Sequence, residues 1–203
     1  MKDDLITLRE KVRSVLDLSR YEHTLGVEYT AAALAMCHGA NVRDAQIAGL
    51  LHDCAKCIPH PDKIAFCQEK GLPISQVEME KPDLLHAKVG SKLAEEEYGI
   101  TNSDILNAIT YHTTGRPGMS LLEKIVFISD YIEPGRDRAK HLKELRRAAF
   151  LDLDQTLLWV LEDTLNYLGT LNISIDPQTE ATYNYYKEQV PVNILFRLEC
   201  QKD

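Results

Sequence analysis

The sequence lacks several features that would place it in a specialised class of protein. It has no run of about 18 consecutive apolar residues, so we expect no membrane-spanning helix. It has no basic excess, since 23 Lys and Arg stand against 31 Asp and Glu, which argues against a general nucleic-acid coat. Repeats, low-complexity tracts and flexible linkers are also absent. The composition, 44% hydrophobic and 27% charged in 203 residues, is that of a globular chain with one sizeable core.

The amino terminus and the cysteines predict the compartment. The segment Met1–Leu5 is acidic and opens no long apolar region, so it does not match a signal peptide. The five cysteines are an odd number and suit reduced thiols, and we expect a cytoplasmic protein. One segment has the ligand types of a structural zinc site but no second, well-spaced cysteine pair. We therefore expect buried or half-buried free thiols, rather than zinc ligands, at Cys54, Cys57 and Cys67, with His60 between them.

Helical periodicity dominates the chain. Apolar residues recur at i, i+3 and i+4 spacing, and no convincing period-2 strand pattern occurs. Asn102, or Ser103 beside it, and Ser120 suit helix N-caps, and Gly39 and Gly99 suit helix ends. The pattern predicts an all-α fold with helices over about 4–18, 22–37, 44–55, 84–98, 103–112, 121–132, 142–168 and 177–188.

Two histidines and two aspartates stand out because apolar residues surround them on predicted helices. They are His23, His52, Asp53 and Asp130. A buried carboxylate is unfavourable unless it is paired or coordinates a metal, so the four side chains together can hold one divalent cation. Imidazole with carboxylate suits Fe, Mn, Ni, Co or Zn better than Mg or Ca. The alternative is that each is a core polar residue with an ordinary hydrogen-bond partner.

The pattern His…His-Asp…Asp on an all-α chain resembles the HD superfamily of metal-dependent phosphohydrolases. Further blocks resemble the YqeK family of symmetrical bis(5'-nucleosyl)-tetraphosphatases. They occur in the order of that family and cover about 20–186. The blocks are 20–27, 51–56, 85–90, 109–115, 128–136 and 175–186.

The resemblance implies a fold and an activity. The fold is an HD-domain helical bundle with a C-terminal helical extension: one domain over 1–203, with a metal-binding core at about 18–136 and the extension at about 137–203. The activity is symmetrical hydrolysis of diadenosine tetraphosphate to two ADP by metal-activated water. It also implies iron as the divalent metal and a homodimer that binds a nucleotide. The donor set leaves Mn, Co, Ni or Zn as alternatives, and the charge and hydropathy of the chain predict that it binds neither nucleic acid nor membrane.

The resemblance also suggests a role for each site residue. His23, His52, Asp53 and Asp130 match the primary metal set, and Asp53 and Lys56 are the expected catalytic residues. His86 and His112 match positions that bind either a second cation or substrate phosphate, and both possibilities stay open. As ordinary core histidines they would instead bond to a backbone partner.

Several polar residues are expected to bind the substrate. Lys56 follows Asp53 by three residues, so we expect both to lie on one helical face. Arg20 and Arg136 can grip phosphate oxygens with two parallel hydrogen bonds. Thr113 offers a hydroxyl and a backbone donor, although turn capping, as for Thr114, explains it equally well. For the three cations the alternative is a solvated surface position.

Three further features have two readings each. The basic segment 134–147 is either a solvated helix face or an electropositive flank for the polyphosphate. The tyrosines Tyr183, Tyr185 and Tyr186 either stack on a base or pack in the core. An apolar stretch is a candidate dimer surface: Ile194, Leu195, Phe196 and Leu198.

Two other functions compete with the tetraphosphatase. One is an HD phosphohydrolase that acts on a different nucleotide, such as a nucleoside monophosphate or a cyclic dinucleotide. The other is a nucleotide-sensing module that keeps the pocket without turnover.

Overall fold

The computed structural model describes residues 5–171, 174–191 and 193–201, and within them it contains helices, turns and loops but no strand. The predicted all-α fold is confirmed. None of the described helices is both long and apolar enough to cross a membrane. In chain order the elements are α1 Leu5–Val15, α2 Leu18–His38, α3 Val42–Leu51, α4 His60–Glu69, α5 Gln76–Glu80, η1 Pro82–Leu85 (a 3-10 helix), α6 His86–Glu96, α7 Ser103–Tyr111, α8 Leu121–Ile132, α9 Leu142–Ala148, α10 Leu153–Thr170, α11 Pro177–Gln189 and α12 Ile194–Cys200.

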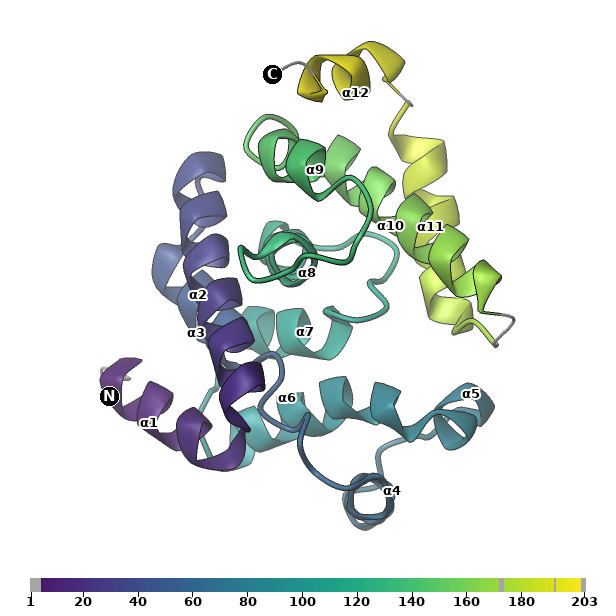
Figure 1. Cartoon of the computed structure of the whole chain (residues 1–203). Helices are drawn as coiled ribbons and strands as arrows, with labels where there is room; N and C mark the ends of the chain where they lie inside the picture. The colour runs from purple at the N-terminus through teal and green to yellow at the C-terminus, as the bar shows by residue number, and fades with distance from the viewer. Residues whose placement is uncertain (1–4, 172–173, 192, 202–203) are drawn as a thin grey trace.

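Helix α8 is the centre of the bundle. It is seen end-on in Figure 1, with α2 and α3 on one side, α7 on another, and α9 and α10 on a third. A helix surrounded in this way must be apolar on most of its faces, and eight of its side chains are buried. One continuous core runs from α1 to α12, and its members include Leu8, Leu51, Ile128, Leu157 and Cys200. Asp130 therefore projects from the most enclosed helix of the molecule.

Side-chain caps set where several helices begin. Asn102 accepts a backbone hydrogen bond from Asp104, and Ser120 forms a capping box with Glu123, as the sequence predicts for both starts. Gly39 ends α2 in the left-handed conformation, where a side chain would be strained. These local signals place the boundaries of α7 and α8 within a residue of the prediction.

The predicted helix 142–168 is wrong as a single element, because the chain breaks between α9 and α10. Asp152 adopts an extended conformation (φ −152°), and its carboxylate accepts hydrogen bonds from the backbone of Asp154 and Gln155. This N-cap starts a new helix in register with the same apolar spacing, so periodicity alone could not show the break.

The predicted helix 44–55 also ends too late. α3 stops at Leu51, and residues 52–58 form successive turns before Pro59. His52 and Asp53 therefore lie just beyond a helix, at its carboxyl end. The periodicity also missed the short helices α4 and α5.

A buried ion pair attaches α1 to the rest of the bundle. Glu28 of α2 is fully buried, and Arg9 of α1 meets its carboxylate with two hydrogen bonds of 2.9 and 2.5 Å. Gln46 of α3 lies 3.5 Å from one of the same oxygens. The charge of Glu28 is thus compensated across three helices.

We expect Arg9→Met to lower the free energy of unfolding by about 3 kcal/mol, because it leaves a buried carboxylate without its counter-ion. Urea denaturation followed by circular dichroism measures the change. Arg13→Met removes a cation from an exposed position of the same helix and serves as the control. Equal stability of the two variants would contradict the importance of the Arg9–Glu28 pair.

Candidate active site

Three histidines of the site are oriented by their own local backbone. In each, Nδ1 donates to the carbonyl oxygen three residues earlier: His52 to Gly49 at 2.7 Å, His86 to Asp83 at 2.5 Å and His112 to Ile109 at 2.7 Å. His52 and His112 follow the last residues of α3 and α7, and His86 opens α6. With Nδ1 as the donor, the neutral ring carries its lone pair on Nε2. All three Nε2 atoms approach Asp53.

The fourth histidine is held by a distant residue. His23 lies within α2, and its Nδ1 donates to Glu133 Oε1 at 3.1 Å. Glu133 is buried directly after α8, and its other oxygen accepts the backbone N–H of Gly135. Gly26 makes room for it, because a Cβ at Gly26 would overlap the Glu133 carboxylate. Glu133 therefore fixes the ring of His23 and the loop after α8 together.

Asp53 bridges two groups of ligand atoms. Its Oδ1 lies 3.1 Å from His86 Nε2 and 3.7 Å from His112 Nε2. Its Oδ2 lies 3.4 Å from His52 Nε2 and 3.9 Å from His23 Nε2. The same Oδ2 accepts a hydrogen bond of 2.9 Å from Arg20. One carboxylate thus faces four imidazoles and a guanidinium.

Asp130 completes the first of these groups. Its Oδ1 lies 3.0 Å from His23 Nε2 and 3.9 Å from His52 Nε2. Arg136 contacts the same oxygen at 2.7 Å and donates to the Asp130 backbone carbonyl at 3.0 Å. The structure therefore brings together all four side chains that the sequence proposes as the primary metal set.

The electrostatics keep both carboxylates ionised at neutral pH. Burial alone would raise the pKa of Asp53, but the surrounding imidazoles outweigh it and hold that pKa well below its usual range. Burial also opposes ionisation of Asp130, but the close approach of His23, together with the nearby His52 and the charge of Arg136, outweighs burial and lowers the pKa of Asp130. Burial lowers the pKa of His86, which favours the neutral ring, whereas the contacts of His23 with Asp130 and Glu133 outweigh burial and raise its pKa. Anionic oxygens and neutral nitrogens are the forms that bind metal.

The residues present fit a divalent cation. His23 Nε2 and His52 Nε2 are buried and have no hydrogen-bond partner among the described residues. Within the described chain, two groups bring three ligand atoms within 4.8 Å of one another: His23 with His52 and Asp130, and His52 with Asp53 and His112. Buried imidazoles whose Nδ1 atoms are bonded to backbone or carboxylate oxygens are typical of metal ligands. Mixed imidazole and carboxylate donors suit first-row transition metals.

Two guanidinium groups lie over the site from different segments. Arg20 and Arg136 both line a pocket of about 530 Å³ with His23, which we call the arginine pocket. The loop that carries Arg136 is pinned by Arg146, whose guanidinium donates to the backbone carbonyls of Ile132, Glu133 and Arg136 at 2.7 to 2.8 Å. Within the basic segment 134–147, Arg146 therefore stabilises the loop after α8, whereas Arg136 contacts the site through Asp130.

Lys56 lies elsewhere than the sequence predicts. The argument from a shared helical face is wrong, because α3 ends before Asp53 and Lys56 belongs to the following turns. Its Nζ pairs with Asp83 Oδ2 at 2.8 Å. The buried Lys63 lies near the other oxygen of Asp83, at 3.9 Å, and donates to the Lys56 carbonyl at 3.1 Å. Since the Asp83 carbonyl orients His86, these lysines stabilise the segment beneath the site.

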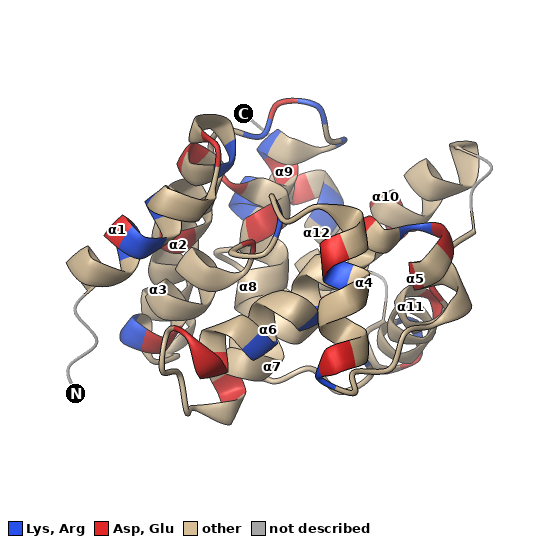
Figure 2. Ribbon diagram, turned by 90° about the horizontal axis from the view of Figure 1, so that it is seen from below, with Lys and Arg blue, Asp and Glu red and all other residues tan. Residues whose placement is uncertain are grey.

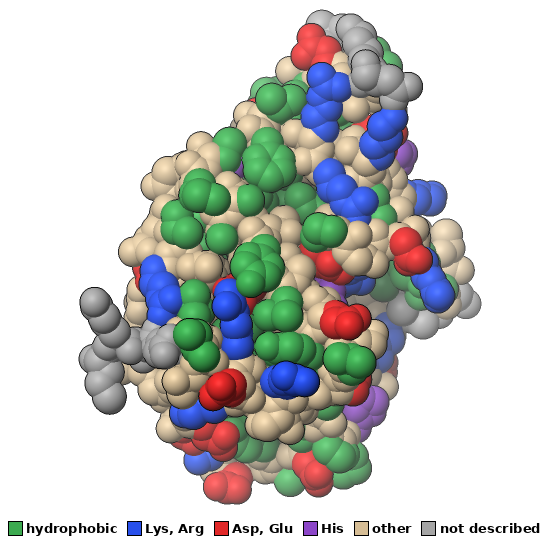
Figure 3. Space-filling view, turned by 60° about the vertical axis from the view of Figure 1, so that its left-hand side comes forward, with side chains coloured by type: hydrophobic (Ala, Val, Ile, Leu, Met, Phe, Trp, Pro, Cys, Tyr) green, Lys and Arg blue, Asp and Glu red, His purple; other side chains and the backbone are tan. Residues whose placement is uncertain are grey.

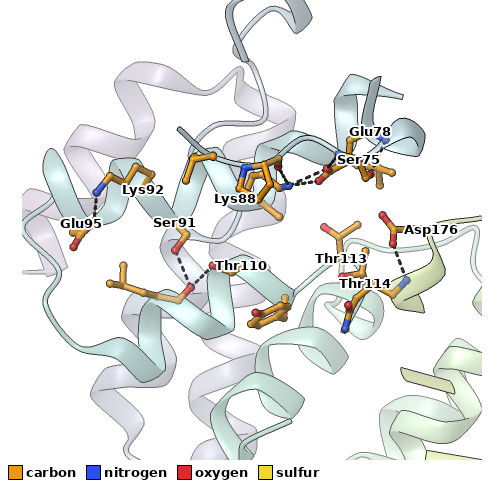
Figure 4. Close-up of a pocket in the computed structure, with 17 residues that line it drawn as sticks. Ser75, Glu78, Lys88, Ser91, Lys92, Glu95, Thr110, Thr113, Thr114 and Asp176 are labelled. Atoms are coloured by element: carbon orange, nitrogen blue, oxygen red, sulfur yellow. Dashed lines mark hydrogen bonds and ion pairs between the residues drawn. The ribbon is translucent and has the colours of Figure 1, made fainter. Parts of the chain in front are cut away.

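Two further pockets meet at Thr113, beside the histidines. The α6–α7 pocket, of about 540 Å³, is drawn in Figure 4, where the hydroxyls of Ser91 and Thr110 both donate to the carbonyl oxygen of Leu106. The aromatic pocket, of about 440 Å³, is lined by His112 and Asp130 together with side chains of α8 and α10. Thr113 lines both, and its Oγ1 lies 3.2 Å from His112 Nε2 and 3.5 Å from His86 Nε2. Thr113 therefore stands where the two pockets meet the cluster.

The other proposed polar residues have mostly structural contacts. The Thr114 hydroxyl donates to the carbonyl of Gly115, which fits turn capping. Tyr186 is buried and its hydroxyl accepts the backbone N–H of Met119, so it packs in the core. Neither Tyr183 nor Tyr185 is among the residues that line the three pockets.

The cysteines follow the expectation of free thiols, and all five are unpaired. Cys54 and Cys67 are buried, whereas Cys57 is exposed rather than half-buried. Burial raises the pKa of the Cys54 thiol to about 12. Among the described residues, the segment 54–67 contributes no cysteine to either group of clustered ligand atoms.

Glu133 and Asp83 are the residues that sequence reasoning missed. Glu133 acts on a histidine 110 positions earlier, a contact that no local pattern reveals. Asp83 acts through its backbone carbonyl, which every residue type possesses. A usable signal for Glu133 is its place in Ile132-Glu133-Pro134-Gly135, where an acid stands at the end of an apolar helix.

Comparisons with known proteins show what the whole chain is similar to. A family model described as "HD domain" matches residues 20–135. The Bacillus subtilis symmetrical bis(5'-nucleosyl)-tetraphosphatase is 40% identical over 174 residues, which are 86% of this chain and 92% of that relative. Its counterpart in Halalkalibacterium halodurans is 41% identical over 173 residues, 85% of this chain and 91% of the relative. The crystal structure of a predicted HD superfamily hydrolase involved in NAD metabolism from Clostridium acetobutylicum superposes with a TM-score of 0.88 and 39% identity, over 92% of this chain and 98% of that one.

We expect Glu133→Gln to weaken Mn²⁺ binding by about tenfold, because a neutral amide is a poorer acceptor for His23 Nδ1 than a carboxylate. Titration calorimetry on the refolded, metal-free protein measures the affinity. Glu97→Gln, at an exposed position outside the site, is the matched control. If both variants bind Mn²⁺ as the wild type does, Glu133 has no part in orienting the metal ligand.

Proposed function

The chain belongs to the HD domain family, and from that premise we propose that it is a symmetrical bis(5'-nucleosyl)-tetraphosphatase, a metal-dependent hydrolase that cleaves diadenosine tetraphosphate to two ADP. The observation that carries the proposal is the bridging position of Asp53, between the His23–His52–Asp130 group and the pair His86 and His112. Relatives of that activity match over most of their length.

We assign His23, His52, Asp53 and Asp130 as the residues that hold the metal. A divalent cation bound there supplies Lewis acidity and lowers the pKa of water toward neutrality. The protein's own part is to keep Asp53 and Asp130 anionic and to aim the imidazole Nε2 atoms at a common centre. Iron is the proposed native metal, on the strength of the family resemblance and of a donor set that suits it.

His86 and His112 form the second half of the site. Their Nε2 atoms lie 3.0 Å apart, and both Nδ1 atoms are occupied by backbone carbonyls. Two lone pairs cannot face each other at that distance without a proton or a cation between them. The pair therefore takes either a second cation or a phosphate oxygen that bonds to a protonated ring. Thr113 supplies a hydroxyl beside both rings.

The arginines bind the polyphosphate in this proposal. Hydrolysis adds one water across the central phosphoanhydride bond, so each product keeps two phosphates. Arg20 and Arg136 converge on the two carboxylates and can share their charge with phosphate oxygens as negative charge moves to the leaving ADP. Asp53 is the proposed catalytic residue. Lys56 stays a weaker candidate for a second catalytic and phosphate-binding residue, since its contact is with Asp83.

We also propose the organisation and location that the sequence suggests. The continuous core supports one domain, with the metal-binding part at about 18–136 and the extension at about 137–203. Five unpaired cysteines suit the cytoplasm. On the side seen in Figure 2, basic and acidic residues are interspersed along the helices, which suits a small nucleotide better than a nucleic acid as ligand.

A homodimer is the proposed assembly, and α12 offers one candidate surface. Ile194 and Leu198 are exposed, whereas Phe196 packs partly against the core. The side chain of Leu195 lies outside the described residues. A second candidate is formed by the exposed hydrophobic residues of α1 and α2, which are Ile6, Val15, Leu18, Tyr29 and Met36. Figure 3 shows a face of the molecule where hydrophobic side chains reach the surface among charged ones.

With Fe²⁺ or Mn²⁺, the protein should convert diadenosine tetraphosphate to ADP alone. Asp53→Ala should reduce turnover to background, because it removes the carboxylate that lies between the His23–His52–Asp130 group and the pair His86 and His112. Product chromatography measures both. Asp62→Ala, an exposed aspartate of α4, is the control. ATP with AMP would mean asymmetric cleavage, and no reaction would favour a different nucleotide. Tight ADP binding without hydrolysis of any substrate would favour the sensing module. Full turnover by Asp53→Ala would disprove the role of Asp53.

Protein purified without oxygen should contain iron as its main metal, and removal of the metal by a chelator should abolish hydrolysis. Elemental analysis of aerobic and anaerobic preparations measures the content. Re-addition of Mn²⁺ to the metal-free protein should raise the Tm, since a ligand that binds only the folded state stabilises it. A preparation that is active with no bound transition metal would contradict the assignment.

Light scattering should give about twice the chain mass of 23.0 kDa. Ile194→Asp, at a position that is 67% exposed, should give a monomer if α12 forms the interface. Met36→Asp tests the α2 face in the same way, and a dimer in both variants would place the interface elsewhere.

A further inference from the structure

The aromatic pocket contains a polar group that the proposed chemistry does not use. Asp163 of α10 lines it, and its side chain is only 7% exposed. Its Oδ2 accepts a hydrogen bond of 2.8 Å from His141 Nδ1. The pocket also contains Phe127 and Tyr131 of α8 and Tyr167 of α10. A buried acceptor among aromatic rings is unusual beside a site for polyanions, because a carboxylate repels phosphate.

His141, the hydrogen-bond partner of Asp163, has an unusual backbone conformation. Among the described residues, His141 is the one non-glycine residue with positive φ, at +52°. Its ring lies 5.2 Å from that of Trp159. A left-handed conformation is uncommon at a residue with a side chain, and contacts around such a residue help to maintain it. The contacts here are the Asp163 hydrogen bond and the Trp159 ring, so the carboxylate is held in one place.

We propose that the aromatic pocket binds a nucleobase of the substrate, and that Asp163 accepts a hydrogen bond from an N–H on the pairing edge of a purine. The inference rests on the proposed function and adds the residue that selects the base. An ionised carboxylate is only an acceptor, so it favours a base edge that carries a donor. Adenine presents its 6-amino group, and guanine presents N1–H with its 2-amino group.

The surroundings of the pocket fit a nucleoside whose phosphates reach the cluster. His112 and Asp130 line it, so the pocket borders the proposed metal ligands directly. Arg136 and Arg138 line both this pocket and the arginine pocket. A nucleotide can therefore place its phosphates by the arginines and its base by Asp163. The volume of about 440 Å³ is within the range of small-molecule sites.

The α6–α7 pocket is a weaker candidate for binding the base, because its charged side chains already have partners. Its two lysines are already paired, Lys88 with Glu78 at 2.7 Å and Lys92 with Glu95 at 2.6 Å, as Figure 4 shows. Glu78 also completes a capping box with Ser75. The lysines in that pocket are therefore paired with glutamates, and the Asp176 carboxylate caps α11 by accepting the backbone N–H of Gln178 at 2.8 Å. Asp163 is the better candidate for base selection.

The decisive variant is Asp163→Asn, tested on the metal-loaded protein by calorimetry with nucleoside diphosphates. The amide keeps an acceptor for His141 and turns a donor toward the base. We expect the wild type to bind ADP roughly tenfold or more tightly than purine riboside 5'-diphosphate, which lacks the 6-amino group. D163N should reduce this ratio to near one. A purely structural role of Asp163 would weaken both ligands equally.

A second pair of ligands distinguishes the two purines. GDP and inosine 5'-diphosphate differ by the 2-amino group. If D163N abolishes a preference for GDP but leaves ADP unaffected, the base is guanine. If neither preference depends on Asp163, the inference is wrong. Glu162→Gln removes a neighbouring carboxylate of the same helix that pairs with Arg197 instead, and it should leave both ratios unchanged.

Tyr167→Ala provides a test that does not risk the fold, because Tyr167 is 60% exposed at this pocket. Loss of a stacking ring should weaken ADP binding by about fivefold or more and leave the binding of inorganic pyrophosphate unchanged. Tyr29→Ala, at a similarly exposed tyrosine of α2, is the control. Equal loss for ADP and pyrophosphate would overturn the assignment. Because these ligands are bound and not hydrolysed, failure of the tetraphosphatase activity would be seen separately.

Discussion

The burial of one charged carboxylate organises this molecule. Asp53 is 3% exposed and ionised, and its compensation comes from side chains that begin in four different parts of the chain. α2 supplies Arg20 and His23, the turn after α3 supplies His52, α6 supplies His86, and the residue that follows α7 is His112. A buried charge without partners is strongly unfavourable. The fold must therefore pack these elements around α8 to compensate the charge of Asp53, and the same packing assembles the side chains of the site.

Much of this site was predictable from the sequence because the informative residues break an apolar pattern. His52, Asp53 and Asp130 each interrupt a hydrophobic stretch, and a polar group at such a position needs a partner in the core. The starts of α7 and α8 were predictable for a similar reason, since Asn102 and Ser120 cap the backbone within four residues. In both cases the physical cause lies close to the residue that shows it.

What could not be predicted depends on contacts between distant segments or on competition between local signals. Glu133 orients His23 across 110 residues, and its neighbours in the sequence give no hint of that partner. The break before α10 arises because Asp152 caps a new helix while the apolar spacing continues unchanged. Lys56 was misplaced because a spacing of three residues implies a shared face only inside a helix, and α3 has already ended.

The anchoring of the four imidazoles has a consequence for how the site comes into being. Three rings are clamped to a carbonyl one turn earlier in their own segment, so their aim is a property of local backbone geometry. The ring of His23 is instead oriented by Glu133, a residue at the end of α8, so its orientation depends on the packing of α2 against that end. The cluster is thus three-quarters preorganised by secondary structure and completed by tertiary docking. The hydrogen bond between His23 Nδ1 and Glu133 therefore forms only in a molecule in which α2 is packed against the end of α8.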